Sequence, residues 1–155
     1  MRMPVYRYLL VFCGSHAEAE DLAQEAFLRL YSDLLRGRSV DSIPAWIFRV
    51  AHNLAIDLQR RRQVENAAGC IQGALAQKQA ADCATSIESN VLEREKLLLV
   101  RAAMEKLTPQ ERQCLELRAE GLRYREIAEI LGIAIPTVQT FLSRAVKKMS
   151  MESHE

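Results

Sequence analysis

The chain has 155 residues, which is enough for one domain or two small ones. Hydrophobic residues make up 49% of it, so the chain can bury a core and is not disordered as a whole. The net charge of +1 creates no global field that would point to nucleic acid, and the low content of glycine, proline and aromatic residues favours an all-helical protein.

The charges are unevenly distributed along the chain. Residues 1–62 carry nine Lys and Arg against seven Asp and Glu, and residues 101–149 carry nine against six. Residues 63–100 carry three against five. Two mildly basic blocks on an acidic connector fit two nucleic-acid modules, although solvated helix faces give the same small differences.

Several functions are excluded by what the sequence lacks. The four cysteines are far apart, with no CxxC pair and no histidine at ligand spacing, so we expect neither a metal site nor a disulfide framework, and no cofactor. His16, His52 and His154 are scattered, and no catalytic or phosphate-loop pattern occurs, so we expect no enzyme. Without a long apolar run or a signal peptide, we expect no membrane insertion and a cytoplasmic location.

The first block, residues 1–62, predicts three helices. An apolar segment from Pro4 to Cys13 reads as the end of a helix that Gly14 breaks. Ser15 is a candidate N-cap, with Glu18 as its capping-box partner, for a helix that runs to Leu35. The predicted core stripe of this helix is Leu22, Ala23, Ala26, Phe27, Leu30 and Leu34.

The opposite face of that helix mixes polar groups with one apolar side chain. At helical spacing it presents Asp21, Gln24, Glu25, Leu28 and Ser32. A single exposed leucine needs no explanation, but a leucine with a polar rim also fits a patch that docks a partner protein. The spacing alone leaves both interpretations open.

A loop at residues 36–44 leads into a helix predicted from Ala45 to Arg62. Its predicted buried stripe is Ile47, Val50, Ala51, Leu54 and Leu58, and another face carries Arg49, Asn53, Asp57 and Arg60. One interpretation is that Trp46 is a core residue and that the terminal Arg60-Arg61-Arg62 cluster stabilises the negative end of the helix macrodipole. The alternative is stacking of Trp46 on unpaired bases, with the guanidinium groups on phosphates.

Residues 63–90 lack sustained periodicity and predict a flexible linker, helical in part. The second block, residues 91–150, predicts four helices, beginning with Val91 to Leu107. Thr108 as N-cap and Glu111 as capping-box acid start the next helix, which runs from Pro109 to Ala119. The expected fold is therefore all-α, with two small helical domains joined by a flexible linker.

The last two helices predict a helix-turn-helix. Ile127, Ala128 and Leu131 face a core, and Gly132 ends the first helix of the pair. Pro136-Thr137 can open the second helix, in which Val138 and Leu142 continue the buried face. Outward lie Gln139, Thr140, Ser143, Arg144 and Lys147, a polar and basic face of the kind that enters a major groove. An ordinary helical hairpin is the alternative.

Three segments in this order resemble a known family: AEDLAQEAFLRLY (19–31), AWIFRVAHNLAIDLQRRR (45–62) and LTPQERQCLELRAEGLRYREIAEILGI…TVQTFLSRAVKKM (107–149). Together they are similar to sigma factors of bacterial RNA polymerase, in the small extracytoplasmic-function (ECF) group of the sigma-70 family. The resemblance covers both blocks. It implies a transcription initiation factor without a catalytic centre.

The resemblance also implies partners and site residues. Asp21, Gln24, Glu25, Leu28 and Ser32 would bind the polymerase core, on the clamp of its largest subunit. Arg38, Ser39, Trp46, Arg49, Asn53, Asp57, Arg60 and Arg61 would melt and read the −10 element of promoter DNA. Arg125, Thr137, Gln139, Thr140, Ser143, Arg144 and Lys147 would read the −35 element. An anti-sigma factor is a further partner that the family allows.

Three features depart from the family pattern. The family usually has a longer segment before Tyr6, so we expect a shortened first helix that leaves part of the first core uncovered. Basic residues often stand where Gln139 and Phe141 stand here, so phosphate contact should be weaker. The turn Ala134-Ile135-Pro136 also differs, so −35 specificity does not carry over from relatives.

A second class shares part of the pattern. Residues 107–133 also resemble the output domain of response regulators, which bind duplex DNA as dimers. A receiver domain would need alternating strands and helices with acidic phosphorylation residues, whereas residues 1–62 predict only helices. The first block therefore favours the sigma factor.

Overall fold

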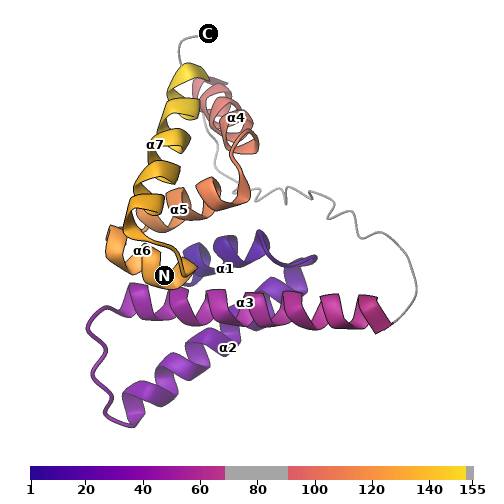
Figure 1. Cartoon of the computed structure of the whole chain (residues 1–155), viewed down its shortest axis with the longest axis vertical. Helices are drawn as coiled ribbons and strands as arrows, with labels where there is room; N and C mark the ends of the chain where they lie inside the picture. Colours follow the sequence, from indigo (N-terminus) through magenta and orange to yellow (C-terminus); the bar gives the residue numbers. More distant parts are fainter. Residues whose placement is uncertain (69–90, 153–155) are drawn as a thin grey trace. The chain divides into compact units, whose positions relative to one another are not determined.

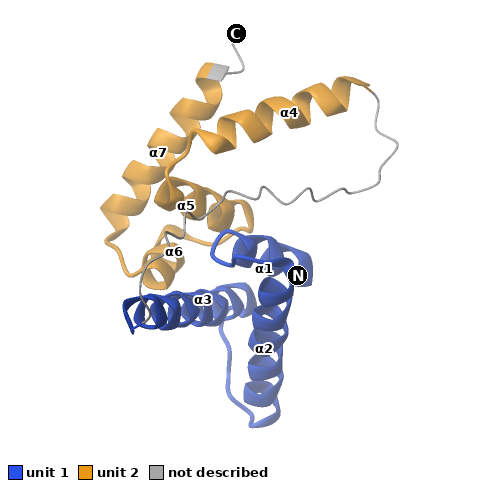
Figure 2. Cartoon of the chain, turned by 90° about the vertical axis from the view of Figure 1, so that its right-hand side faces the viewer, with its two compact units in different colours: residues 1–81 blue, residues 82–155 orange. Residues whose placement is uncertain are grey.

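A computed structural model describes residues 1–68 and 91–152 of the chain. These residues form seven α-helices and no strand, which confirms the predicted all-α fold (Figure 1). The chain divides into two compact units, residues 1–81 (unit 1) and residues 82–155 (unit 2), coloured separately in Figure 2. Most of the predicted linker, from residue 69 to residue 90, lies outside the described residues.

Unit 1 is a bundle of three helices, α1 (Arg2–Leu10), α2 (His16–Leu35) and α3 (Ile43–Ala68), each of which packs against the other two. The predicted N-cap of α2 is confirmed: the Ser15 hydroxyl accepts a hydrogen bond from the backbone N–H of Glu18 at 3.3 Å. The Glu18 carboxylate accepts the N–H of Gly14 at 3.1 Å and pairs with Arg62 on α3. That guanidinium lowers the pKa of Glu18, so the first turn of α2 is tied to the third helix.

The core of unit 1 contains an aromatic cluster of Tyr8, Phe12, Phe48 and His52. The Tyr8 hydroxyl lies 2.8 Å from Nδ1 of His52 and can donate to it while that ring is neutral. Phe48 meets Tyr8 edge-on with ring centroids 5.6 Å apart, and Phe12 meets His52 at 5.4 Å. The sequence prediction placed Ile47 and Ala51 correctly but missed the buried Phe48 and His52 beside them.

Two sequence predictions for unit 1 are wrong. The helix α3 runs from Ile43 to Ala68 rather than from Ala45 to Arg62, and it continues past Arg62 because neither glycine nor proline interrupts residues 63–68. Leu34, predicted in the core, is 45% exposed, since the last turn of α2 projects past α1 and α3 (Figures 1 and 2).

Unit 2 contains α4 (Val91–Glu105), α5 (Pro109–Ala119), α6 (Tyr124–Leu131) and α7 (Ile135–Glu152), and α7 packs against each of the other three. The bounds of α5 and its capping box, Thr108 with Glu111, are as predicted. The predicted end of α4 is wrong, because the helix ends at Glu105 rather than at Leu107; its Leu92 and Leu99 are exposed. Among the helices described in either unit, none is long and apolar enough to cross a membrane.

The buried His52 predicts a pH-dependent stability of unit 1. Burial lowers the pKa of His52 below its ordinary value of 6.5, so the unfolded chain binds a proton there more readily than the folded one. Stability should be fully present above that value and fall as the pH drops through it. Between about pH 7.5 and about pH 5, the unfolding temperature should decrease, roughly 4–8 °C for each kcal/mol lost.

The single tryptophan of the chain, Trp46, reports this transition by fluorescence because it lies in unit 1. The matched variant His52→Gln keeps a polar group at this position but removes the titration, so its unfolding temperature should vary much less over the same range. An equal pH dependence in both proteins would show that another group causes it.

Candidate nucleic-acid interface

The predicted helix-turn-helix is formed by α6 and α7. Gly132 ends α6 in the left-handed region with φ 66°, as the glycine there predicted. The N–H of Ile133 donates to the carbonyl of Ala128 at 3.1 Å, which closes the last turn. Pro136 stands in the first turn of α7, where a missing N–H costs nothing.

The two faces of α7 are separated as predicted. Val138, Leu142 and Ala145 are buried. The predicted outward residues Gln139, Thr140, Ser143, Arg144 and Lys147 are all exposed. Of the other two −35 candidates, Arg125 on α6 is exposed, with Nε 3.4 Å from a Glu129 oxygen, and Thr137 is half-buried. The Thr140 hydroxyl donates to the carbonyl of Pro136 at 3.0 Å, which leaves its oxygen free to accept only.

The sequence prediction did not include one basic residue whose contacts reach the start of α6. Arg118, in the last turn of α5, donates to the carbonyl of Leu122 at 2.9 Å. Its guanidinium lies over the Tyr124 ring, 5.3 Å from the centroid. These contacts fix the loop that leads into the helix-turn-helix. The sequence shows a basic residue at a helix end, but its partners lie beyond the turn at Gly121.

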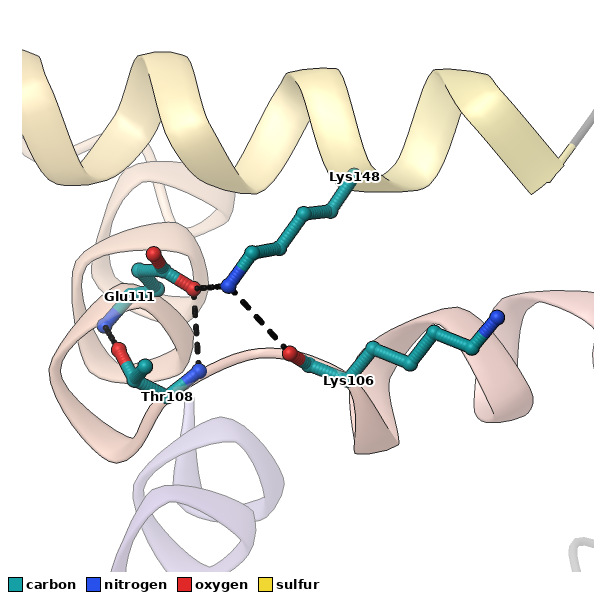
Figure 3. A network of polar contacts seen from close by, with 4 residues as sticks. All are labelled: Lys106, Thr108, Glu111 and Lys148. Carbon is teal, nitrogen blue, oxygen red and sulfur yellow. Dashed lines mark hydrogen bonds and ion pairs between the residues drawn. The ribbon is translucent and has the colours of Figure 1, made fainter.

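A polar network ties α7 to the junction of α4 and α5 (Figure 3). The Glu111 side chain is 3% exposed, and its carboxylate accepts hydrogen bonds from the N–H of Thr108 at 3.0 Å and from the ammonium of Lys148 at 2.7 Å. Lys148 also donates to the carbonyl of Lys106 at 3.4 Å. The sequence predicted only the local half of this network, the capping box.

In unit 1, three of the five predicted docking residues, Glu25, Leu28 and Ser32, line a hollow of about 370 Å³ between α2 and the start of α3. Its lining comprises Glu25, Leu28, Arg29, Ser32, Asp33, Arg36 and Trp46. Leu28 is 64% exposed, and Asp21 and Gln24 are exposed on the same helix. The sequence prediction missed Arg29, Asp33 and Arg36, although Arg29 and Arg36 follow Glu25 and Ser32 by one helical turn. Trp46, assigned to the −10 set, thus stands beside the docking set.

The remaining −10 candidates lie on α3 and on the loop before it. Arg49, Asn53, Asp57, Arg60 and Arg61 are exposed, and Trp46 is half-buried. Arg38 and Ser39 are exposed in the loop, with the Arg38 guanidinium 3.6 Å from a carboxylate oxygen of Asp33. The third arginine of the terminal cluster, Arg62, is engaged by Glu18.

An exposed polar and basic recognition helix after a glycine turn defines a DNA-binding protein of the helix-turn-helix class. Comparison with known families narrows this class. Residues 2–65 match the model of sigma-70 region 2, and residues 97–149 match that of sigma-70 region 4. The chain belongs to the ECF sigma factors of the sigma-70 family, a non-enzymatic family that binds RNA polymerase core and promoters, and it is a factor for transcription initiation.

Characterised relatives span nearly the whole chain. It is 31% identical to the ECF sigma factor EcfG of Rhodopseudomonas palustris over 92% of this chain and 75% of that protein. It is also 31% identical to SigL of Mycobacterium tuberculosis over 97% and 83%, and 30% identical to SigW of Bacillus subtilis over 90% and 78%. These matches exclude the response-regulator alternative, which has no region 2.

Two solved structures share the fold. Sigma factor RpoE of Bartonella quintana, in complex with the anti-sigma factor NepR, is 21% identical with a TM-score of 0.65, over 99% of this chain and 91% of that one. CnrH, in complex with the cytosolic domain of CnrY, is 23% identical with a TM-score of 0.55, over 96% and 79%.

Proposed function

We propose that the chain acts through three surfaces, one for the polymerase and two for the promoter. The hollow on α2 binds the clamp of the largest polymerase subunit. The loop before α3 and the outward face of α3 capture the melted −10 strand, and α7 enters the major groove at the −35 element. Binding energy stabilises the open complex, and the polymerase performs the chemistry in the cytoplasm.

The polymerase surface is supported by the exposed Leu28, which lines the hollow. An apolar side chain surrounded by the charged Glu25, Arg29 and Asp33 matches a small interface with an apolar centre and a polar rim. The rim charges are largely paired, with Arg29 Nε 2.8 Å from a Glu25 oxygen. A partner that covers the hollow therefore buries Leu28 without leaving these charges unpaired.

The −10 surface is supported by the exposed cations and amide along α3. Arg49 and Asn53 follow Trp46 at helical spacing, and Asp57 and Arg60 continue the same stripe. Guanidinium groups serve phosphates, and an amide can read a base edge. Trp46 lines the hollow beside Leu28, so we assign it to the support of both surfaces rather than to base stacking alone.

The −35 surface is supported by the exposed stripe on α7. Its cations, Arg144 and Lys147, are of the type that contacts phosphate, and Gln139, Thr140 and Ser143 have polar groups that can reach base edges. The exposed Arg125 adds a cation from α6. Thr137 is half-buried, so we propose that it holds the first turn of α7 in position rather than contacting a base.

We also propose an anti-sigma factor as a partner. The two similar solved structures described above each contain a protein complex, with NepR in one and the cytosolic domain of CnrY in the other. An inhibitor that covers the hollow around Leu28 would compete with the polymerase for the same apolar group.

The deciding experiment is run-off transcription on fragmented genomic DNA of the source organism. Core polymerase with the full chain should produce discrete transcripts that core polymerase alone does not. Their start sites then give the promoter. Transcripts that do not depend on the chain would refute the proposed function.

The docking surface predicts that Leu28→Asp weakens binding of core polymerase by at least about 30-fold, the effect of losing an interface centre of about 2 kcal/mol. Its unfolding temperature should hardly change, because the side chain is exposed. Val64→Asp, a matched change at a 68% exposed apolar side chain on α3, should leave binding intact. Equal binding by both variants, measured by fluorescence anisotropy, would disprove the docking assignment.

The −35 surface predicts that Arg144→Ala weakens binding of the holoenzyme to upstream duplex DNA. Since each phosphate contact releases a counterion, the slope of log affinity against log salt should become shallower by about 1. A titration in several salt concentrations measures this slope. If the affinity falls while the slope is retained, Arg144 does not reach phosphate.

A further inference from the structure

The buried carboxylate of Glu111 lies where three helices of unit 2 meet. It belongs to α5, it accepts the N–H of Thr108 just after α4, and it pairs with Lys148 on α7 (Figure 3). Burial acts to raise its pKa, but the Lys148 ammonium, the Thr108 N–H and the charge of Arg144 together hold the pKa of Glu111 below its usual value. Glu111 is therefore an anion inside the DNA-binding unit at neutral pH.

The Lys148 ammonium pairs with this carboxylate, although the Lys148 side chain as a whole is 39% exposed. Its ammonium lies 2.7 Å from a Glu111 oxygen and 3.4 Å from the carbonyl of Lys106, so two of its three donors are in use. The neighbouring Lys147 has an exposed side chain and belongs to the outward stripe. Two adjacent lysines thus have different environments.

Arg144 precedes Lys148 by one turn of α7, so both side chains lie along the same side of the helix. The same carboxylate that holds Lys148 therefore lies within electrostatic reach of Arg144. A carboxylate without its lysine would attract that guanidinium as a phosphate does, because both are oxyanions that arginine binds through charge-assisted hydrogen bonds.

We propose that Lys148 is a positioning residue for DNA binding: by neutralising Glu111, it leaves Arg144 available to the promoter phosphate. This inference rests on the proposed function of α7. Lys148 itself does not contact DNA. When Lys148 is absent, Glu111 captures Arg144, and the protein loses a phosphate contact without losing the side chain that makes it.

The test measures the salt slope of holoenzyme binding to a short duplex that carries the upstream element of a promoter found by run-off transcription. Lys148→Met should make the slope shallower by about 1, as Arg144→Ala does. The double variant Lys148→Met with Glu111→Gln should recover the wild-type slope, since a glutamine amide still accepts the Thr108 N–H but no longer attracts Arg144. The variant Lys148→Gln can still donate to Glu111, and its salt slope should become shallower by the same amount as that of Lys148→Met. This variant covers the case in which the methionine variant does not fold.

The matched control is the adjacent lysine. Lys147→Met should also make the slope shallower by about 1, but adding Glu111→Gln should not restore it. If Lys148→Met behaves like Lys147→Met, with no recovery, Lys148 contacts DNA directly and the inference is wrong. If Lys148→Met keeps the full slope in a folded protein, the pair serves stability alone, which also refutes it. If Arg144→Ala itself keeps the full slope, both the −35 assignment and this inference fail.

Discussion

The backbone N–H groups in the first turn of a helix have no partner within that helix, and this constraint shapes both units. Ser15 and Thr108 each satisfy one such group with a hydroxyl, and a glutamate stands three residues later in both cases. Each glutamate accepts a second backbone N–H, from Gly14 in unit 1 and from Thr108 in unit 2. As a result, each of these two helix starts has a negatively charged carboxylate beside it.

Each of these carboxylates also forms an ion pair with a residue that is distant in the sequence. Glu18 pairs with Arg62 near the end of α3, and Glu111 pairs with Lys148 near the end of α7. In each unit the last helix is thus tied to a capped helix start. The carboxylate of the ion pair in unit 2 is the more deeply buried of the two, since Glu111 is buried while the Glu18 side chain is about one-third exposed. Exposed pairs contribute little to stability, so the unit 2 tie is the stronger constraint on its recognition helix.

Local signals explain how much could be predicted from the sequence. The N-caps at Ser15 and Thr108, the left-handed glycine at residue 132 and the bounds of α5 depend on residues within one turn of each other. The separation of buried Val138 and Leu142 from the exposed stripe on α7 follows from helical periodicity alone. The exposure of the polar and basic stripe on α7 was therefore predictable from the sequence.

Contacts between distant segments were not predictable in this way. His52 faces Tyr8 across the first bundle, and Lys148 faces Glu111 across the second, and neither pairing leaves a trace in local spacing. Leu34 shows the opposite error: it has the spacing of a core residue but is 45% exposed. Whether an apolar stripe is buried depends on helix length and crossing, which periodicity does not encode.

The small number of cations on the recognition helix makes their surroundings important. Gln139 is neutral and Phe141 is half-buried, so Arg144 and Lys147 are the two cations of the outward stripe that α7 presents. When few cations bind phosphate, each one provides a larger share of the salt-dependent affinity. An unneutralised carboxylate beside Arg144 would then remove one of these two cations, and with it about half of the salt-dependent affinity that α7 provides. A recognition helix with many cations could tolerate such a loss, whereas the proposed −35 surface of this chain would depend on keeping Glu111 paired.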